Sequence, residues 1–164
     1  MKFKIDRKEF LVGLQIVQPN STKEFPNVKI DVTESNIKLT TNNSESMMVY
    51  KVPSETNGDQ TFCIILTGSA ILSCKKLINV LKKMKNEVID IECFENKVVV
   101  SNTQHTSKFQ FNVEVKFFEE QLIEESPQLC VDAEEMKKSL NSVVHCISKN
   151  EIRPVLTTVN MKYD

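Results

Sequence analysis

The residues best placed to do chemistry in this sequence are the lysines between positions 75 and 83. If this segment is a helix, a polar arc of about 120° contains them, at 100° per residue. The residues in this arc are Lys75, Lys76, Asn79, Lys82 and Lys83. Ammonium groups gathered on one face suit the phosphates of a nucleic acid, because each neutralised phosphate releases condensed counterions. The alternative is an ordinary amphipathic helix whose lysine face is only solvated.

No comparable pattern supports catalysis. The two histidines, His105 and His145, lie far apart and in no zinc-binding spacing. Gly68-Ser69 lacks the flanking glycines of a nucleophile elbow, and three glycines in the chain are too few for a glycine-rich phosphate loop. We therefore expect no catalytic residue, no metal site and no cofactor. An enzyme with an unrecognised site is a distant alternative.

The composition is that of an ordinary globular protein. The chain has 164 residues, of which 40% are hydrophobic and 26% charged. Its net charge is -1, so contact with a nucleic acid requires positive charge concentrated on one face. The five cysteines form no CxxC pair, no apolar signal-peptide region precedes Asp6, and no apolar run reaches the roughly 18 residues of a membrane span. These features predict a cytoplasmic protein with reduced cysteines and no membrane contact.

An internal repeat organises the elements that must position the lysines. Three segments each combine a short strand, a helix-capping Asp or Ser, and apolar residues four, eight and eleven positions after the cap. The caps are Asp6, Ser73 and Asp132, which are 67 and then 59 residues apart. The apolar residues are Phe10, Leu14 and Val17, then Leu77, Leu81 and Met84, and finally Met136, Leu140 and Val143. The lysines therefore lie on the second helix, opposite a stripe that we expect to contain Val80 as well.

Between the helices the apolar period changes from 3.6 to 2, which predicts strands. Three strands are expected after each of the first two helices, at 28–32, 37–39 and 47–52 and then at 88–93, 98–101 and 108–113. Residues 53–60 indicate a loop and 62–66 a further strand, and the third helix is followed by one expected strand at 155–163. We predict an α+β protein with two strand-helix-strand-strand-strand halves in residues 1–118, an acidic linker at 119–127, and an incomplete third unit at 128–164.

Two segments resemble a known family. Residues 1–11, MKFKIDRKEFL, are similar to the opening of bacterial sliding clamps, the beta subunits of DNA polymerase III. Residues 147–157, ISKNEIRPVLT, are similar to the start of the second domain of these clamps. The resemblance covers essentially the whole chain. It implies the DNA-clamp fold, in which helices line a concave face around DNA and antiparallel sheets lie outside.

The resemblance also implies a function and its partners. A clamp is a non-catalytic processivity factor, counted as a component of the polymerase holoenzyme, and this chain would be such a factor or a fragment of one. The implied partners are double-stranded DNA, DNA polymerase and the clamp loader. The contact with DNA would be made to the backbone and would be indifferent to base sequence.

Particular residues are assigned by the same resemblance. Those assigned to DNA contact are Lys75, Lys76, Lys82, Lys83 and Arg153. Arg153 matches a residue near the inner rim of the second domain, and a purely structural arginine is the alternative. The strand at 108–111 matches the edge at which two chains of the ring meet, so Phe109 and Phe111 are either interface anchors or core residues.

Several residues depart from the family pattern, and an alternative function stays open. The loop at 19–26 is shortened, Asn42-Asn43 replaces a threonine-aspartate pair, and the segment 102–108 has lost arginines, which predicts weaker DNA contact. The family's peptide pocket lies between second and third domains, and neither is complete in this chain. The alternative function is therefore a short clamp-like protein that binds a full clamp or a replication partner without encircling DNA. We also expect self-association or pairing with another clamp chain, because the third unit has too few strands to cover its helix.

Overall fold

The computed structural model describes residues 1–43, 45–56, 58–85, 88–94, 97–110, 117, 130–148, 150 and 152–162. The chain divides into two compact units, Met1–Glu119 and Glu120–Asp164. In the described part of the first unit the elements follow in this order: β1 Lys2–Asp6, α1 Arg7–Val17, a 3-10 turn Gln18–Asn20, β2 Asn27–Val32, β3 Ile37–Asn42, β4 Met47–Lys51, β5 Glu55–Thr56, β6 Asp59–Gln60, β7 Phe62–Leu66, β8 Gly68–Ser73, α2 Cys74–Lys83, β9 Val88–Phe94, β10 Lys97–Ser101 and β11 Thr106–Gln110.

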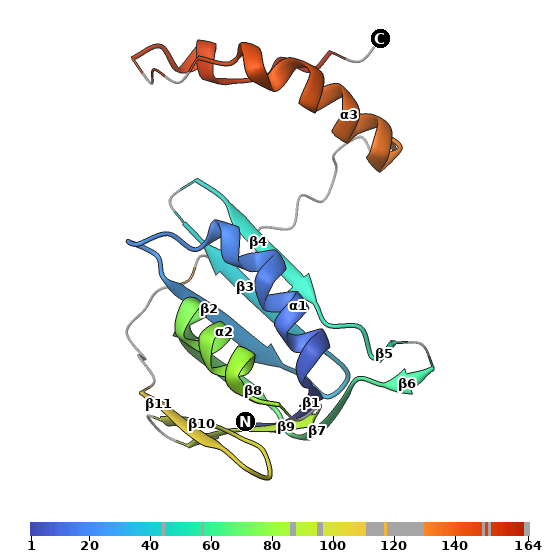
Figure 1. The fold of residues 1–164 in the computed structure, drawn as a ribbon, viewed down its shortest axis with the longest axis vertical. Helices are drawn as coiled ribbons and strands as arrows, with labels where there is room; N and C mark the ends of the chain where they lie inside the picture. Colours follow the sequence, from blue (N-terminus) through green and yellow to red (C-terminus); the bar gives the residue numbers. More distant parts are fainter. Residues whose placement is uncertain are drawn as a thin grey trace. The chain divides into compact units, whose positions relative to one another are not determined.

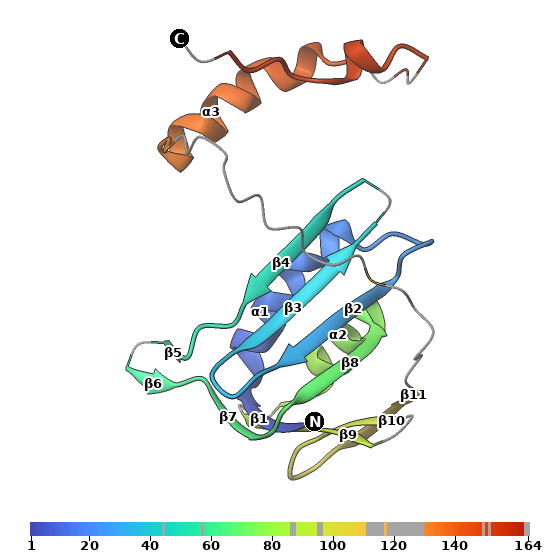
Figure 2. The same ribbon diagram turned by 180° about the vertical axis from the view of Figure 1, so that it is seen from behind.

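Two main antiparallel sheets form the first unit, and each combines strands from both halves of the repeat. Their strand orders are β11-β10-β9-β1-β7 and β4-β3-β2-β8 (Figures 1 and 2). Strand β1 begins the first half but pairs with β9 of the second half, where Asp6 lies opposite Val88. Strand β8 begins the second half but pairs with β2 of the first, where Ser73 lies opposite Asn27. The two halves therefore interlock and fold as one unit.

Both helices lie on one face of the four-stranded sheet. Helix α1 packs on β3 and β4, α2 contacts β8, and the two helices contact each other side by side (Figure 1). The core between helices and sheets is apolar, and its largest fully buried side chains are Phe3, Ile5, Phe10, Leu14, Ile30, Ile37, Leu39, Leu72, Leu77, Leu81, Ile89 and Ile91. The helices and strands of both halves confirm the predicted α+β fold.

The segment at 53–60, predicted to be a loop, contains the short hairpin β5–β6. Gly58 in its turn has a φ of 88°, a left-handed conformation that glycine adopts without steric cost. Strands of two residues are too short for alternation to reveal them. Strand β11 was expected to reach residue 113, but only its part up to Gln110 lies within the described residues.

The second unit contains α3, Ala133–Val143, followed by 3-10 turns at Val144–Cys146 and Pro154–Thr157. The strand predicted at 155–163 is wrong for the described residues, because Pro154 opens a turn in which the Leu156 N–H donates to the Arg153 carbonyl at 2.9 Å. No neighbouring strand is present among the described residues of this unit, and an isolated strand lacks ladder partners. Among all described residues, no helix is long and apolar enough to cross a membrane.

Candidate nucleic-acid interface

Helix α2 is anchored at both ends by backbone hydrogen bonds. At its start the Cys74 N–H donates to the Pro26 carbonyl at 2.9 Å, and at its end the Met84 N–H donates to the Leu81 carbonyl at 3.3 Å. Ser73 occupies the cap position, but its side chain makes no capping hydrogen bond. The predicted helix start is confirmed, whereas the predicted side-chain cap at Ser73 is wrong.

The buried side of α2 is broader than the predicted stripe. The buried residues of the helix are Cys74, Leu77, Ile78 and Leu81, while Val80 is only half-buried. Because α2 contacts α1 as well as β8, its apolar arc is wide enough to include Ile78 and Cys74. Burial raises the pKa of the Cys74 thiol from 9.0 to about 11, so this cysteine is not an activated nucleophile.

The opposite side of α2 carries the predicted lysine face. Its members Lys75, Lys76, Asn79, Lys82 and Lys83 are all exposed. Cations in the last turn of a helix are favoured by the helix dipole, which fits Lys82 and Lys83. Cations in the first turn are disfavoured, by about 0.3–1 kcal/mol each at low ionic strength. The positions of Lys75 and Lys76 therefore do not serve helix stability.

The first turns of the other two long helices contain acidic residues. Helix α1 has Glu9 beside the cations Arg7 and Lys8, and α3 has Glu134 and Glu135. The outward side of α1 is not cationic along its length either, because Val12 and Ile16 are each 44% exposed. In the part of the chain that the structure describes, the sequence-predicted lysines thus form a face that belongs to α2 rather than to both helices.

Arg7 joins the start of α1 to the end of α2. Its guanidinium Nη1 donates to the Leu81 carbonyl at 3.3 Å, and the same carbonyl also accepts the Met84 N–H. This contact links the first turn of α1 to the last turn of α2. Sequence patterns contained no signal for it, because 74 residues separate the donor from the acceptor.

The other predicted site residues lie on separate elements. Phe109 is on β11, an edge strand, where it is half-buried and packs against the core. Phe111 lies outside the described residues. Arg153 is exposed and belongs to the second unit.

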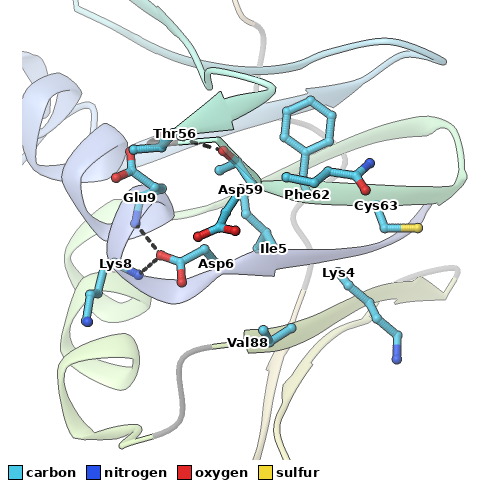
Figure 3. Close-up of a pocket in the computed structure, with 12 residues that line it drawn as sticks. Lys4, Ile5, Asp6, Lys8, Glu9, Thr56, Asp59, Phe62, Cys63 and Val88 are labelled. Atoms are coloured by element: carbon cyan, nitrogen blue, oxygen red, sulfur yellow. Dashed lines mark hydrogen bonds between the residues drawn. The ribbon is translucent and has the colours of Figure 1, made fainter.

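Two grooves open at the starts of the two helices. The groove at α2, which we call the basic groove, has a volume of about 830 Å³ and is lined by Asn27, Ile71, Leu72, Ser73, Lys76, Asn79, Val80, Lys108, Phe109 and Gln110. The groove at α1, which we call the acidic groove, has a volume of about 540 Å³ and is lined by Lys4, Ile5, Asp6, Lys8, Glu9, Thr56, Asp59, Gln60, Thr61, Phe62, Cys63 and Val88 (Figure 3). Sequence reasoning missed both, because their walls come from distant segments.

The acidic groove contains the cap of α1. The Asp6 carboxylate accepts the backbone N–H groups of Lys8 and Glu9 at 2.8 and 2.9 Å (Figure 3). Asp59 enters the same groove from the β5–β6 hairpin. Among the described residues no group of three or more histidine, cysteine or acidic side chains is arranged to hold a metal ion.

Comparisons with known proteins agree with this arrangement. Residues 1–119 match the family model described as the DNA polymerase III beta subunit, N-terminal domain. The Beta sliding clamp of Streptococcus pneumoniae strain R6 is 26% identical over 164 residues, covering 96% of this chain and 43% of the clamp. The DNA polymerase sliding clamp of Bacillus subtilis superposes with a TM-score of 0.88 at 18% identity, covering 94% of this chain and 42% of that one.

A Helicobacter pylori beta clamp bound to a DNA ligase peptide superposes with a TM-score of 0.78 at 14% identity, covering 93% of this chain and 42% of the clamp. This chain therefore spans about 43% of the length of the curated relative it matches. The fold is that of the sliding clamps, with two antiparallel sheets and a helix pair on one side. The chain belongs to the DNA polymerase III beta subunit family, whose N-terminal domain its residues 1–119 match.

Proposed function

We propose that this chain contributes to a DNA polymerase processivity clamp and contacts duplex DNA through the lysine face of α2. The observation that carries the proposal is the placement of four exposed lysines on one side of α2, two of them in its first turn. Membership of the beta subunit family supports it. Lysine side chains deliver point charges to phosphates without reading bases, which suits a clamp that must slide over any sequence. The role is structural and topological, not catalytic.

The proposal extends to residues and partners. Arg153 adds a DNA contact from the second unit, and Phe109 and Phe111 anchor the edge at which clamp chains meet. The domain limits that we propose are 1–118 for the first clamp domain, 119–127 for a linker and 128–164 for the start of the second. DNA polymerase and the clamp loader are the proposed protein partners, and the ligase peptide on the Helicobacter pylori clamp supports the idea that clamps hold enzymes by short peptides. Such a replication component works in the cytoplasm.

Neutralising the lysine face tests the DNA contact. In the variant Lys75→Gln/Lys76→Gln/Lys82→Gln/Lys83→Gln, we expect weaker binding to a linear duplex and a shallower salt dependence of the binding constant. Each lost phosphate contact lowers the slope by about 0.9, so the four together remove roughly 3 to 4. The matched control replaces Lys23, Lys38, Lys51 and Lys97 with glutamine, which makes the same change in net charge. The control is expected to keep most of the slope.

Equal slopes for the two quadruple variants would remove the α2 face from the proposed site. Encirclement is tested separately, on closed circular duplex in the presence of a clamp loader. A closed ring stays on circular DNA when salt is raised but slides off the same DNA once it is linearised, whereas a backbone contact alone dissociates from both. Loss from both forms would favour the short interaction protein over the clamp.

A further inference from the structure

Strand β7 lies at the edge of the five-stranded sheet and has no second neighbour among the described strands. It pairs only with β1. No backbone hydrogen bond from another described segment reaches its residues Phe62–Leu66. Its sequence, FCIIL, contains neither proline nor a charged side chain, two of the features that keep an edge strand from pairing. The outer edge of β7 therefore has hydrogen-bonding groups to offer to a further strand.

The part of β7 next to the acidic groove is the regular part of the strand. Phe62, Cys63 and Ile64 pair in sequence with β1, whereas Ile65 has no partner residue there and forms a bulge. Farther from the groove, the side chains of Ile65 and Leu66 are 47% and 59% exposed. The strand thus combines a regular stretch for backbone pairing with exposed apolar side chains for packing.

The acidic groove begins where β7 begins. Phe62 and Cys63 belong both to the strand and to the lining of the groove. The apolar wall of the groove also includes Ile5 and Val88, and Val88 is 56% exposed. A long cationic side chain suits such a wall, because its methylene stem packs on apolar surface while its charged head stays in water.

The charge balance of the groove is negative. Its lining has three carboxylates, Asp6, Glu9 and Asp59, and two lysines, Lys4 and Lys8 (Figure 3). The Lys4 ammonium lies 3.5 Å from a carboxylate of β9 that is outside the groove, so its charge is offset there. Among the described residues, neither Glu9 nor Asp59 takes part in an ion pair. The groove therefore favours a cationic partner, because charge complementarity selects partners and fixes their orientation.

We propose that β7 and the acidic groove together form a docking site for an extended basic segment of a partner protein. The segment pairs with β7 as an added strand and places an arginine or lysine side chain in the groove, beside Glu9 and Asp59. In strand addition the backbone hydrogen bonds supply affinity, and pockets for alternate side chains supply specificity. The inference does not rest on DNA binding, since none of these residues belongs to the lysine face of α2.

Short synthetic peptides test the site on the full chain. The probe is a fluorescein-labelled peptide in which arginine alternates with valine, and fluorescence anisotropy at low salt measures its binding. A peptide with glutamate in place of arginine tests the charge. An arginine peptide that is N-methylated at alternate amides tests the backbone pairing, because a methylated amide cannot donate a hydrogen bond. We expect both comparison peptides to bind at least about tenfold more weakly than the probe.

Removal of the unpaired carboxylates tests the groove. Glu9→Gln/Asp59→Asn should weaken binding of the arginine peptide about tenfold at low salt. The matched control is Glu24→Gln/Glu45→Gln, which removes the same charge from exposed loop positions outside the groove and should leave the affinity almost unchanged.

A charge placed on the strand tests the edge. Ile65→Lys introduces the kind of side chain that keeps edge strands from pairing, and we expect it to abolish binding of the arginine peptide. Val12→Lys is the matched control, because it adds the same charge at a similarly exposed position of α1, and it should retain binding. Circular dichroism checks that each variant folds.

The proposal is overturned if the arginine peptide does not bind, or if the glutamate or N-methylated peptide binds as tightly. It is also overturned if a control variant weakens binding as much as the variant it matches. Sedimentation velocity tests the remaining occupant, a second copy of the chain. Self-association of the wild type that Ile65→Lys abolishes would assign this edge to a second copy and overturn the peptide site.

Discussion

Helices α1 and α3 share one local design and differ in their surroundings. Each has 11 residues and begins after an aspartate whose carboxylate accepts a backbone N–H of the first turn. Each carries apolar residues four, eight and eleven positions after that aspartate. In α1 these residues, Phe10, Leu14 and Val17, are all 0% exposed. In α3 Met136 and Leu140 are half-buried, Val143 is 42% exposed, and no residue of the helix is buried.

The comparison distinguishes the capping of a helix, which its own sequence determines, from its burial, which depends on packing. A cap forms from atoms within three residues of each other, so both helices have one. Burial depends on partners from elsewhere in the chain, and α1 obtains them chiefly from α2, β3 and β4. Most helical stability in proteins comes from packing of the apolar face. We therefore expect equivalent substitutions in α1 and α3 to differ most where they touch the core and least where they touch the cap.

The largest difference in stability between equivalent substitutions in α1 and α3 is expected at the middle of the apolar stripe. Leu14→Ala removes a fully buried side chain and should cost about 3 kcal/mol, the transfer free energy plus the cavity term. Leu140→Ala, at the same position of a half-buried stripe, should cost less than about 1 kcal/mol. Amide hydrogen exchange resolved over the two helices measures both losses in the same sample. An equal loss in α3 would mean that this helix has a packed core in solution.

Smaller effects on stability, opposite in sign for the two helices, are expected at Gly13 and Ser139, one residue before Leu14 and Leu140. An added Cβ at Gly13 would lie 2.7 Å from two ring atoms of Tyr50, so Gly13→Ala should destabilise the first unit by about 1–2 kcal/mol. The better helix propensity of alanine, worth about 1 kcal/mol, offsets only part of the strain. Ser139→Ala, at the equivalent exposed position of α3, should stabilise that helix by a few tenths of a kcal/mol.

Hydrogen exchange again measures both substitutions. The control for the contact is Tyr50→Ala, which should abolish most of the cost of Gly13→Ala because the clashing ring is gone. If Gly13→Ala costs as much in the Tyr50→Ala background as in the wild type, the strain arises elsewhere.

The sequence predicted the helices because capping residues and apolar spacing both lie within the helix segment itself. Asp6, Ser73 and Asp132 predicted the starts of all three long helices. The spacing of the apolar residues on the second helix correctly predicted that Lys75, Lys76, Lys82 and Lys83 are exposed. Alternation located the strands but carried no information on which half each strand would join. The exchange of β1 and β8 is therefore a result of tertiary packing alone.

The candidate site was predictable in its parts and not in its assembly. The spacing of the lysines predicted the cationic face of the site. The two grooves, however, are formed by strands that come together from distant parts of the sequence. Alternation at 108–111 left Phe109 either in the core or at an edge, and its half-buried place on an edge strand has features of both. The strand expected at 155–163 was wrong because alternation does not supply a partner strand.

The smallest effects are expected at the caps, where α1 and α3 should behave alike. Asp6 accepts N–H groups from Lys8 and Glu9, and Asp132 accepts one from Glu135 at 2.9 Å. Asp6→Ala and Asp132→Ala should each cost about 1 kcal/mol, measured by hydrogen exchange in the first turn of the affected helix.

Ser73→Ala is the internal control for this last comparison. The Ser73 side chain makes no capping bond, and a backbone bond from Cys74 to Pro26 anchors the start of α2 instead. Its loss should therefore change the exchange of the first turn of α2 by only a few tenths of a kcal/mol. A cost as large as that of Asp6→Ala would mean that the Ser73 hydroxyl does cap α2 in solution. Equal costs at Asp6 and Asp132, beside unequal costs at Leu14 and Leu140, would show that capping is set within each helix and burial by its neighbours.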